Sequence, residues 1–397
     1  MPGKTARSTP STTVCVARGA GSRPHLTSVL QEGRKRVNIH VRSGAIWGIR
    51  FKNSNIILAN LRHAVVLVRY DIEADWQLLN TCNYRCAYCF LPPVVLGEKL
   101  TVHGEPEAWR RAFDRTGLTW LLHITGGEPT VYPRFAELCQ LLTAKHYISF
   151  NSNLTQPSIV EVAKRVDPSR VNFINAGLHA EERQLRKGLT KFLEHAACLK
   201  ERGFPIFISI VATSDVLSRV DEIVALTEPI GLTPIPKLMR GAYKSRIYPE
   251  AYTVKERSTF IEFGTRARES YRPLLRVLSE RPSIDVFGDG NYVDGTPEFR
   301  GRKCSAGEKF VSLQPDGQVY RCEEKQSNYL GNILDDSFQP RTGKSRCDSN
   351  YCFYFCLKYA DAPSFSAALI RDTTKLSRTI RGSAALRKIS SAVSTRL

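Results

Sequence analysis

The sequence has no run of eighteen uninterrupted apolar residues, the length that a membrane-spanning helix requires. Its most apolar stretch, residues 55–68, is interrupted by Asn60, Arg62 and His63, which argues against a membrane span. No basic segment followed by an apolar one opens the sequence, which argues against a secreted protein. With 42% hydrophobic and 24% charged residues, the composition excludes collagen-like, coiled-coil and wholly disordered chains. We therefore expect a globular cytoplasmic protein with a substantial core.

Acidic residues are scarce at both ends of the chain. Residues 1–70 contain twelve Lys and Arg against one acid, Glu32, and residues 361–397 contain seven against two. The formal charge of +19 therefore belongs mostly to the ends, because the body from 71 to 360 has only +3. A nucleic-acid enzyme is expected to have its positive patch on the folded body, so this distribution argues against a nucleic-acid substrate.

The two basic ends differ in pattern. Residues 1–70 are predicted to be a largely disordered arm, because the first forty are rich in Ser, Thr, Gly, Pro and Arg. An organelle transit peptide and a mis-called start are the alternative interpretations. Residues 361–397 place apolar side chains at mostly three-, four- and seven-residue steps among basic ones, which is typical of a basic amphipathic helix. Such a tail could lie on an anionic membrane or a partner, or be a solvated helix.

Eleven cysteines are present, and eight of them fall in two tight groups. This clustering favours metal binding over a disulfide framework. Cys139 and Cys198 lie in apolar, helix-like segments and are predicted to be buried small hydrophobic residues, whereas Cys15 lies in the predicted arm. The first group is Cys82, Cys86 and Cys89, and the second is Cys304, Cys322, Cys347, Cys352 and Cys356.

From residue 75 onward the sequence alternates between short apolar strands and amphipathic helices. Six such units predict an α/β fold with a parallel sheet, because parallel strands need helical crossovers. A closed barrel needs eight units, so we expect an open (β/α)6 partial TIM barrel, with its chemistry at the carboxyl ends of the strands. The predicted strands are 75–79, 118–124, 147–151, 171–176, 205–212 and 232–238, and the predicted helices are 105–116, 133–146, 158–166, 181–202 and 216–227.

The first cysteine group follows the first predicted strand with the spacing C-x3-C-x2-C. Three thiolates on one loop suit either an iron-sulfur cube or a zinc site, since both take soft sulfur ligands. The odd number favours the cube, because a closed structural zinc site needs a fourth ligand. A cube held by three thiolates leaves one iron open for a substrate.

This spacing, Tyr88 before the last cysteine, and Gly126-Gly127-Glu128-Pro129 after the second strand together resemble the radical S-adenosylmethionine (radical SAM) superfamily. The resemblance implies that Cys82, Cys86 and Cys89 hold a 4Fe-4S cluster whose open iron binds SAM. Cleavage of SAM would then give methionine and a 5′-deoxyadenosyl radical that abstracts hydrogen. The Gly126–Pro129 motif implies a SAM-binding turn, where two glycines let backbone carbonyls approach the ligand's ammonium.

Other strand ends supply further cofactor-binding candidates by the same resemblance. His179 follows the fourth strand, where Ser-Leu-His is usual, so Gly177 departs from the pattern and one hydroxyl contact is in doubt. Val211 lies where the fifth strand packs on adenine, and Arg240, like Lys237, could meet a carboxylate. The group after the third strand is Asn151, Ser152 and Asn153.

The second cysteine group surrounds a hairpin signal, Asp316-Gly317 between residues 310–313 and 318–320. The group resembles the SPASM/twitch extension of radical SAM enzymes, which binds auxiliary 4Fe-4S clusters. The full SPASM pattern has seven cysteines and five are present here, so one auxiliary cluster is expected. Its predicted ligands are Cys304, Cys322, Cys356 and one of Cys347 and Cys352. A zinc ribbon is the alternative for this module.

We therefore divide the chain into a radical SAM barrel (71–245), a helical linker (246–300) and an auxiliary cluster domain (301–360) between the two basic ends. The predicted function is hydrogen abstraction and oxidation of a peptide or protein, helped by an external low-potential donor such as flavodoxin or ferredoxin. The alternatives are a radical SAM dehydrogenase of a small molecule such as an amino sugar, and a non-catalytic iron-sulfur or zinc module.

Overall fold

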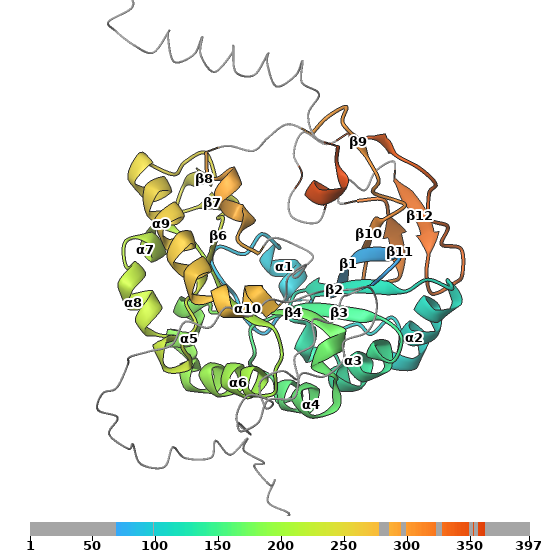
Figure 1. Cartoon of the computed structure of the whole chain (residues 1–397), viewed down its shortest axis with the longest axis horizontal. Coiled ribbons are helices and arrows are strands. Elements are labelled where there is room, and N and C mark those ends of the chain that lie inside the picture. Colours follow the sequence, from blue (N-terminus) through green and yellow to red (C-terminus); the bar gives the residue numbers. More distant parts are fainter. Residues whose placement is uncertain are drawn as a thin grey trace, which may run out of the picture. The chain divides into compact units, whose positions relative to one another are not determined.

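A computed structural model describes residues 69–97, 99–277, 286–294, 299–322, 328–348, 352 and 356–361 (Figure 1). The predictions for the N-terminal arm up to residue 68, including Cys15, and for the tail from residue 362 lie outside these residues. Within the described part, no helix is long and apolar enough to cross a membrane.

The six predicted strands pair in parallel and form one part of a larger sheet. Neighbouring strands pair in parallel in the order β1-β2-β3-β4-β5-β6, and β6 does not return to β1. The predicted open (β/α)6 barrel is thus confirmed. The strands are β1 Ile72–Leu79, β2 Trp120–Gly126, β3 Tyr147–Ser152, β4 Val171–Gly177, β5 Ile206–Val211 and β6 Ile235–Lys237.

The crossover helices cover the outer face of this sheet (Figure 1). The prediction of a single helix over 181–202 is wrong, because this segment forms two helices. The first ends at Lys187, where the chain turns and the residue takes a left-handed conformation (φ 51°). The helix predicted over 216–227 is also divided into shorter pieces. The helices are α1 Pro93–Leu96, α2 Pro106–Arg115, α3 Phe135–Thr143, α4 Ser158–Arg165, α5 Ala180–Arg186, α6 Leu189–Glu201, α7 Ser214–Leu217, α8 Val220–Ala225, α9 Val254–Ser270 and α10 Arg272–Val277.

A cluster of large aromatic residues joins the first strands to α2. Trp76 on β1 is fully buried, with ring centroids 4.7 Å from Trp109 and 5.2 Å from Phe113 on α2. Burial of each such side chain contributes about 1.5–3 kcal/mol. Cys139 and Cys198 are buried in α3 and α6, as predicted.

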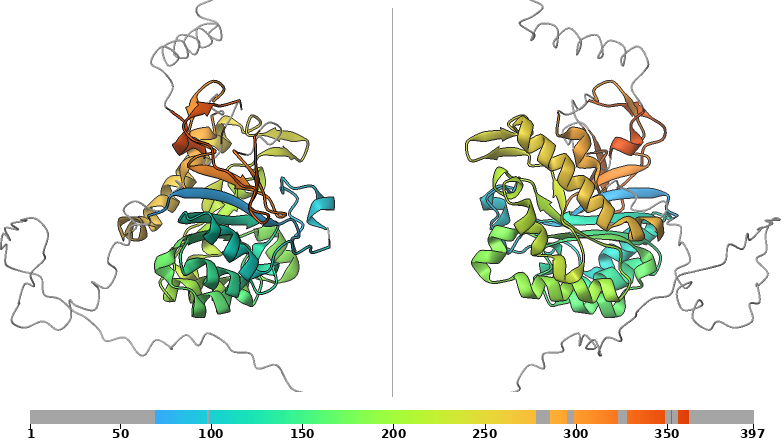
Figure 2. Two further views of the ribbon diagram at one scale, coloured as in Figure 1. Left: turned by 90° about the vertical axis from the view of Figure 1, so that its right-hand side faces the viewer. Right: turned by 60° about the vertical axis from the view of Figure 1, so that its left-hand side comes forward.

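The second part of the chain extends the barrel sheet. The predicted hairpin is confirmed as β10 Phe310–Leu313 and β11 Gln318–Tyr320, which pair antiparallel, and β12 Tyr329–Asn332 follows. β10 also pairs in parallel with the free edge of β1, with Glu73 opposite Phe310. One nine-stranded sheet therefore joins both cysteine regions. Two smaller ladders have two strands each. β7 Gly241–Tyr243 pairs with β8 Arg246–Tyr248, and this hairpin projects beside α1 (Figure 2). The other ladder pairs β9 Lys303–Cys304 with β13 Ser345–Arg346.

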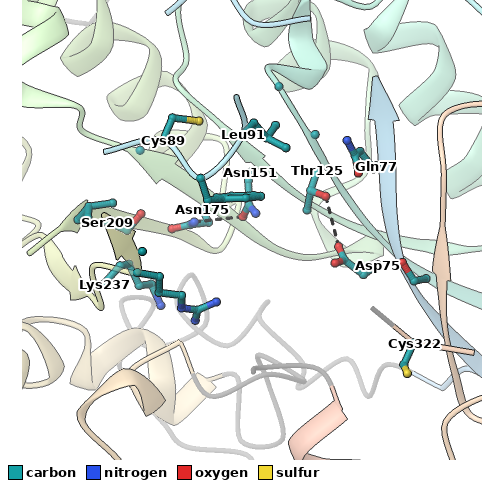
Figure 3. Close-up of a pocket in the computed structure, with 18 of the residues that line it drawn as sticks. Asp75, Gln77, Cys89, Leu91, Thr125, Asn151, Asn175, Ser209, Lys237 and Cys322 are labelled. Carbon is teal, nitrogen blue, oxygen red and sulfur yellow. Dashed lines mark hydrogen bonds between the residues drawn. The ribbon is translucent and has the colours of Figure 1, made fainter. Parts of the chain in front are cut away.

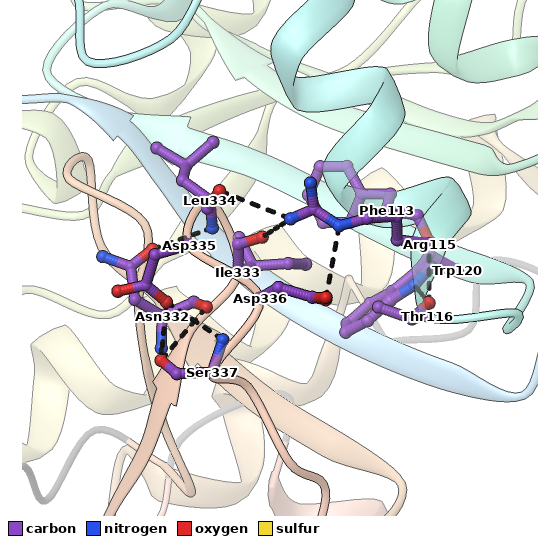
Figure 4. A network of polar contacts seen from close by, with 10 residues as sticks. All are labelled: Phe113, Arg115, Thr116, Trp120, Asn332, Ile333, Leu334, Asp335, Asp336 and Ser337. Atoms are coloured by element: carbon purple, nitrogen blue, oxygen red, sulfur yellow. Dashed lines mark hydrogen bonds and ion pairs between the residues drawn. The ribbon is translucent and has the colours of Figure 1, made fainter.

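An arginine at the end of α2 ties this extension to the barrel helices (Figure 4). The Arg115 guanidinium donates to the carbonyls of Ile333 and Leu334 at 3.0 and 3.3 Å and pairs with Asp336 at 3.3 Å. The extension is thus fixed to the outside of the barrel as well as to the edge of β1.

Candidate active site

The first cysteine group lies on the loop that leaves the carboxyl end of β1. The Cys82 N–H donates to the Leu96 carbonyl at 3.2 Å, and the Cys89 N–H donates to the Cys86 carbonyl at 3.0 Å. All three cysteines are free and partly exposed. The loop therefore holds three available thiols at the end of the barrel where the sequence predicted the chemistry.

The glycine pair after β2 anchors this loop. A Cβ on Gly127 would lie 2.2 Å from the Thr81 carbonyl oxygen and 2.3 Å from that of Asn80, and a Cβ on Gly126 would lie 2.1 Å from the Leu79 carbonyl oxygen. The Gly127 N–H also donates to the Leu79 carbonyl at 2.9 Å. The close approach that requires glycine in this structure is to the protein's own backbone, whereas the sequence analysis expected an approach to a ligand.

Glu128 is buried and its carboxylate is bound to protein donors. It accepts from the Ser152 hydroxyl at 2.8 Å, the Asn153 N–H at 2.6 Å, and the N–H and hydroxyl of Thr130. Burial raises the pKa of Glu128. This carboxylate joins the ends of β2 and β3, while Pro129 begins the buried 3-10 turn η1 (Pro129–Val131) and does not line the cavity described below.

A buried arginine supports the same region from α5. Arg183 donates to the carbonyls of Asn153 at 2.6 Å and Gly177 at 2.8 Å, and lies over the Phe192 ring at 3.8 Å. Asn153 also donates to Asn83 in the cysteine loop at 2.8 Å. Arg183 thus holds the carboxyl ends of β3 and β4 together under the loop.

His179 contacts the cysteine loop directly. Its Nδ1 lies 2.9 Å from the Tyr88 hydroxyl and 3.5 Å from Cys86 Sγ. A Cβ on Gly177 would lie 2.3 Å from the His179 ring, so the departure at Gly177 makes room for this imidazole. Burial lowers the pKa of His179 to about 3, with Arg183 adding to the effect, so the ring is neutral.

Both cysteine groups face one cavity of about 1340 Å³. From the second group, Cys304 and Cys352 are buried together, and Cys322 and Cys347 pack against them. Cys356 begins the 3-10 turn η5 (Cys356–Tyr359), and its side chain lies outside the described residues. The predicted site residues that line the cavity are Cys82, Cys86, Tyr88, Cys89, Gly126, Gly127, Glu128, Asn151, Ser152, Asn153, His179, Val211, Arg240, Cys304, Cys322, Cys347 and Cys352.

A row of polar side chains forms the barrel wall of this cavity (Figure 3). Thr125 donates to Asp75 at 3.3 Å, and Asn175 donates to Asn151 at 3.1 Å. In the view of Figure 3, Cys89 and Cys322 lie on opposite sides of this row. The row consists of Asp75, Thr125, Asn151, Asn175, Ser209 and Lys237, one from each of β1 to β6.

The sequence reasoning missed several of these residues. The row could have been found, because a member can share one face of its strand with another cavity residue two positions away, as Asp75 does with Gln77 and Ser209 with Val211. Arg183 has no comparable signal, since it lies among charged residues of a helix and looks like part of a solvated face.

The donor set fits iron-sulfur clusters. Soft thiols without disulfide bonds are the ligands that such clusters take. Burial raises the pKa of the Cys82 thiol to about 11 and that of Cys86 to about 12, so loading of a metal has to displace their protons. Within the described part of the chain, no three His, Cys, Asp or Glu side chains converge as the ligands of a single metal ion would.

Comparisons with known proteins agree with the resemblance to the radical SAM superfamily. The family model described as "Radical SAM superfamily" matches residues 76–224. The chain is similar to the PqqA peptide cyclase of Ruegeria pomeroyi, with 25% identity over 281 residues that cover 67% of this chain and 71% of the relative. It is also similar to the mycofactocin maturase MftC of Mycolicibacterium smegmatis, with 24% identity over 274 residues, 66% of this chain and 67% of the relative.

The chain is also similar to solved structures, among them anSMEcpe with bound AdoMet, at 19% identity and a TM-score of 0.45, covering 67% of this chain and 79% of that one. Streptococcus suis SuiB bound to the precursor peptide SuiA has 15% identity and a TM-score of 0.45, covering 71% and 67%. The family model, together with the open parallel barrel, identifies residues 76–224 as a radical SAM domain.

Proposed function

We propose that this protein is a radical SAM enzyme that modifies a peptide by hydrogen abstraction followed by oxidation, and that it holds one auxiliary 4Fe-4S cluster. The single observation that supports this proposal most strongly is the shared cavity, onto which both cysteine groups open. A substrate in that cavity would lie between the site where hydrogen is removed and a second site able to accept an electron.

The first cluster, on Cys82, Cys86 and Cys89, would supply the electron that cleaves SAM to methionine and a 5′-deoxyadenosyl radical. Around it, Gly127 and Glu128 fix the loop and the ends of β2 and β3 through the contacts described above. Asn151 is exposed to the cavity and is therefore a candidate contact for SAM or substrate. Arg240 and Lys237 provide positive charge for a carboxylate.

The auxiliary site would be built from Cys304, Cys322, Cys356 and one of Cys347 and Cys352. Its surroundings include Phe299 and Phe310, which are fully buried. Exclusion of water and hydrogen bonds to the thiolates tune the potential of such a cluster. This site therefore suits the role of electron acceptor after hydrogen abstraction.

Two observations favour a peptide as the substrate. Asn151 and Asn175 on the cavity wall, with Gln77 and Gln314, offer amide groups that can pair with a peptide backbone. One similar protein, the PqqA peptide cyclase, acts on a peptide according to its name.

The test uses the full-length protein, reconstituted with iron and sulfide without oxygen and supplied with SAM and a low-potential donor such as flavodoxin. We expect 5′-deoxyadenosine from the wild type and none from Cys86→Ala, because two thiolates cannot assemble the open cluster. Small peptides encoded beside the gene are then tested by mass spectrometry for the loss of two hydrogens. SAM cleavage by Cys86→Ala would contradict the first site, and oxidation of an amino sugar with no change in any peptide would contradict the substrate class.

A further inference from the structure

A buried carboxylate lies deeper in the barrel than the polar row. Glu73 on β1 is fully buried and does not line the cavity. Its Oε1 lies 2.5 Å from His123 Nε2, and its Oε2 lies 2.5 Å from Lys358 Nζ and accepts from the Tyr70 hydroxyl at 3.1 Å. The Tyr359 hydroxyl donates to the same oxygen. Four partners from three parts of the chain therefore meet on one carboxylate.

Two of these partners belong to the segment that contains the last auxiliary cysteine. Lys358 and Tyr359 lie in η5, which begins at Cys356. The same segment also lies beside Cys304, because the Asp361 N–H donates to the Lys303 carbonyl at 2.8 Å and Ala360 forms a bridge with Cys304. One short stretch thus connects two predicted ligands of the auxiliary cluster to β1.

On its barrel side, Glu73 is fixed by neighbouring strands. His123 on β2 is buried, and its Nδ1 is hydrogen-bonded to the buried Ser149 hydroxyl on β3. β1 pairs with both β2 and β10, so Glu73 occupies the strand that joins the barrel to the extension. The carboxylate therefore has a fixed position on the rigid barrel and presents its second oxygen to η5.

Burial of the charged Glu73, which pairs with the more exposed Lys358, does not by itself make a strong case for stability. The cost of removing two charges from water often cancels their attraction, whereas removal of one partner leaves an uncompensated charge. The better-supported use of such groups is to specify one arrangement of the chain. Here the arrangement that Glu73 specifies is the docking of η5 against β1.

We propose that Glu73 is a positioning residue for the auxiliary cluster, which it serves by holding Lys358 and Tyr359 and so placing Cys356 next to Cys304. This inference rests on the proposed function, because it requires that the second cysteine group binds a cluster. Glu73 acts through η5 and is not a ligand. Its loss should therefore affect the auxiliary site and spare the first.

The experiment compares the full-length wild type with Glu73→Gln after anaerobic reconstitution. The amide keeps the shape of the side chain but loses the charge that pairs with Lys358. We expect the iron content to fall from about eight to about four per chain. The electron paramagnetic resonance signal of the auxiliary cluster should be lost, while 5′-deoxyadenosine formation persists.

Two further variants separate positioning from folding. Tyr359→Phe removes one hydroxyl and keeps the ring, whose centroid lies 6.0 Å from that of Phe310, so it should retain its iron but shift the signal or potential of the auxiliary cluster. Glu161→Gln is the matched control, because it neutralises an exposed acid paired with Lys164 at 3.0 Å. This control variant should leave the iron content unchanged, together with the electron paramagnetic resonance signals and the potentials of both clusters.

The outcomes distinguish the two proposals. About four irons in the wild type would contradict the auxiliary cluster itself. About eight irons in both the wild type and Glu73→Gln, with identical signals and with no change in Tyr359→Phe, would contradict the role of Glu73. Loss of both clusters in a Glu73→Gln protein that remains folded by circular dichroism would also contradict it, because the effect would then not be specific to the auxiliary site. The Tyr359→Phe result remains decisive if Glu73→Gln fails to fold.

Discussion

The two cysteine groups face the same cavity but are held in place by different physical means. The first loop is fixed by backbone contacts at distances that leave no room for a side chain, as at Gly127 against Thr81. The second group lies in the extension, whose β10 pairs with β1, and this extension is also held by side chains, with Arg115 on the outside and Glu73 inside. The first site therefore belongs to the barrel framework, whereas the second is attached to it.

This difference suggests what each site requires. A loop held by close backbone packing has little freedom, which suits a cluster that must present one iron to SAM in a fixed geometry. Attachment by charged side chains and a short strand pair leaves the barrel intact when the attachment fails. We therefore expect damage at the first site to abolish all chemistry, and damage at the second to abolish only the later step.

The largest expected effect is that of Gly127→Ala. The new methyl group would collide with the Asn80 and Thr81 carbonyl oxygens, which must move together with the cysteine loop. We expect loss of the first cluster, about half of the iron, and all 5′-deoxyadenosine formation. Iron analysis measures the loss of the cluster, and chromatography of the SAM products measures the loss of 5′-deoxyadenosine.

Gly264→Ala is the control for this substitution. Gly264 lies in α9, and its nearest neighbour to an added Cβ is Pro236 at 3.8 Å, which is ordinary contact. Alanine in a helix interior is favoured over glycine by about 1 kcal/mol, so this variant should keep both clusters. Normal SAM cleavage by Gly127→Ala would show that the loop does not depend on close packing.

The next effect is that of Cys304→Ala. This variant should lose about half of its iron but still cleave SAM, since the first loop does not depend on Cys304. Its yield of oxidised product should be low, because the electron acceptor is lost. The control is Cys139→Ala, since Cys139 is a buried free cysteine outside both groups.

Three results would contradict the proposed auxiliary site. About twelve irons in the wild type would indicate more than one auxiliary cluster. One zinc per chain would favour a zinc ribbon. Undiminished oxidised product from Cys304→Ala, with cluster loss confirmed by iron analysis, would leave this site a purely structural role.

The sequence predicted the barrel well, and it placed the first cysteine group at the carboxyl end of the first strand, because both depend on local patterns. Strand and helix alternation is a property of neighbouring residues, and the cysteine loop and the Gly126–Pro129 motif are contiguous. The division of residues 181–202 into two helices was not predicted, although Gly188, which follows the left-handed Lys187 and caps the second helix, is a helix-breaking signal in the sequence.

The rest depends on contacts between residues far apart in the sequence. The pairing of β10 with β1 joins residues 310–313 to 73–76, and nothing in either segment specifies the other. The ion pair of Glu73 with Lys358 likewise connects two residues that each look ordinary in the sequence. Such contacts become visible only when the fold brings the two segments together.

The smallest effect is expected in a region that holds neither cysteine group. Thr253 caps α9: its hydroxyl accepts from the Glu256 N–H at 3.2 Å, and the Glu256 carboxylate accepts from the Thr253 N–H at 2.7 Å. Thr253→Ala removes the first of these bonds and should lower the free energy of unfolding by about 1 kcal/mol. Thr253→Ser keeps the hydroxyl and should be close to the wild type in denaturant titrations.

This variant sharpens the comparison because α9 packs on β6, at the opposite end of the sheet from β10. If the two cysteine groups differ in how they are attached, a modest loss of global stability should strip iron from neither. We expect Thr253→Ala to unfold at lower denaturant with a full complement of iron and a normal rate of SAM cleavage. Loss of auxiliary iron in Thr253→Ala would mean that this cluster responds to overall stability, and that its sensitivity to Glu73 does not report a specific attachment.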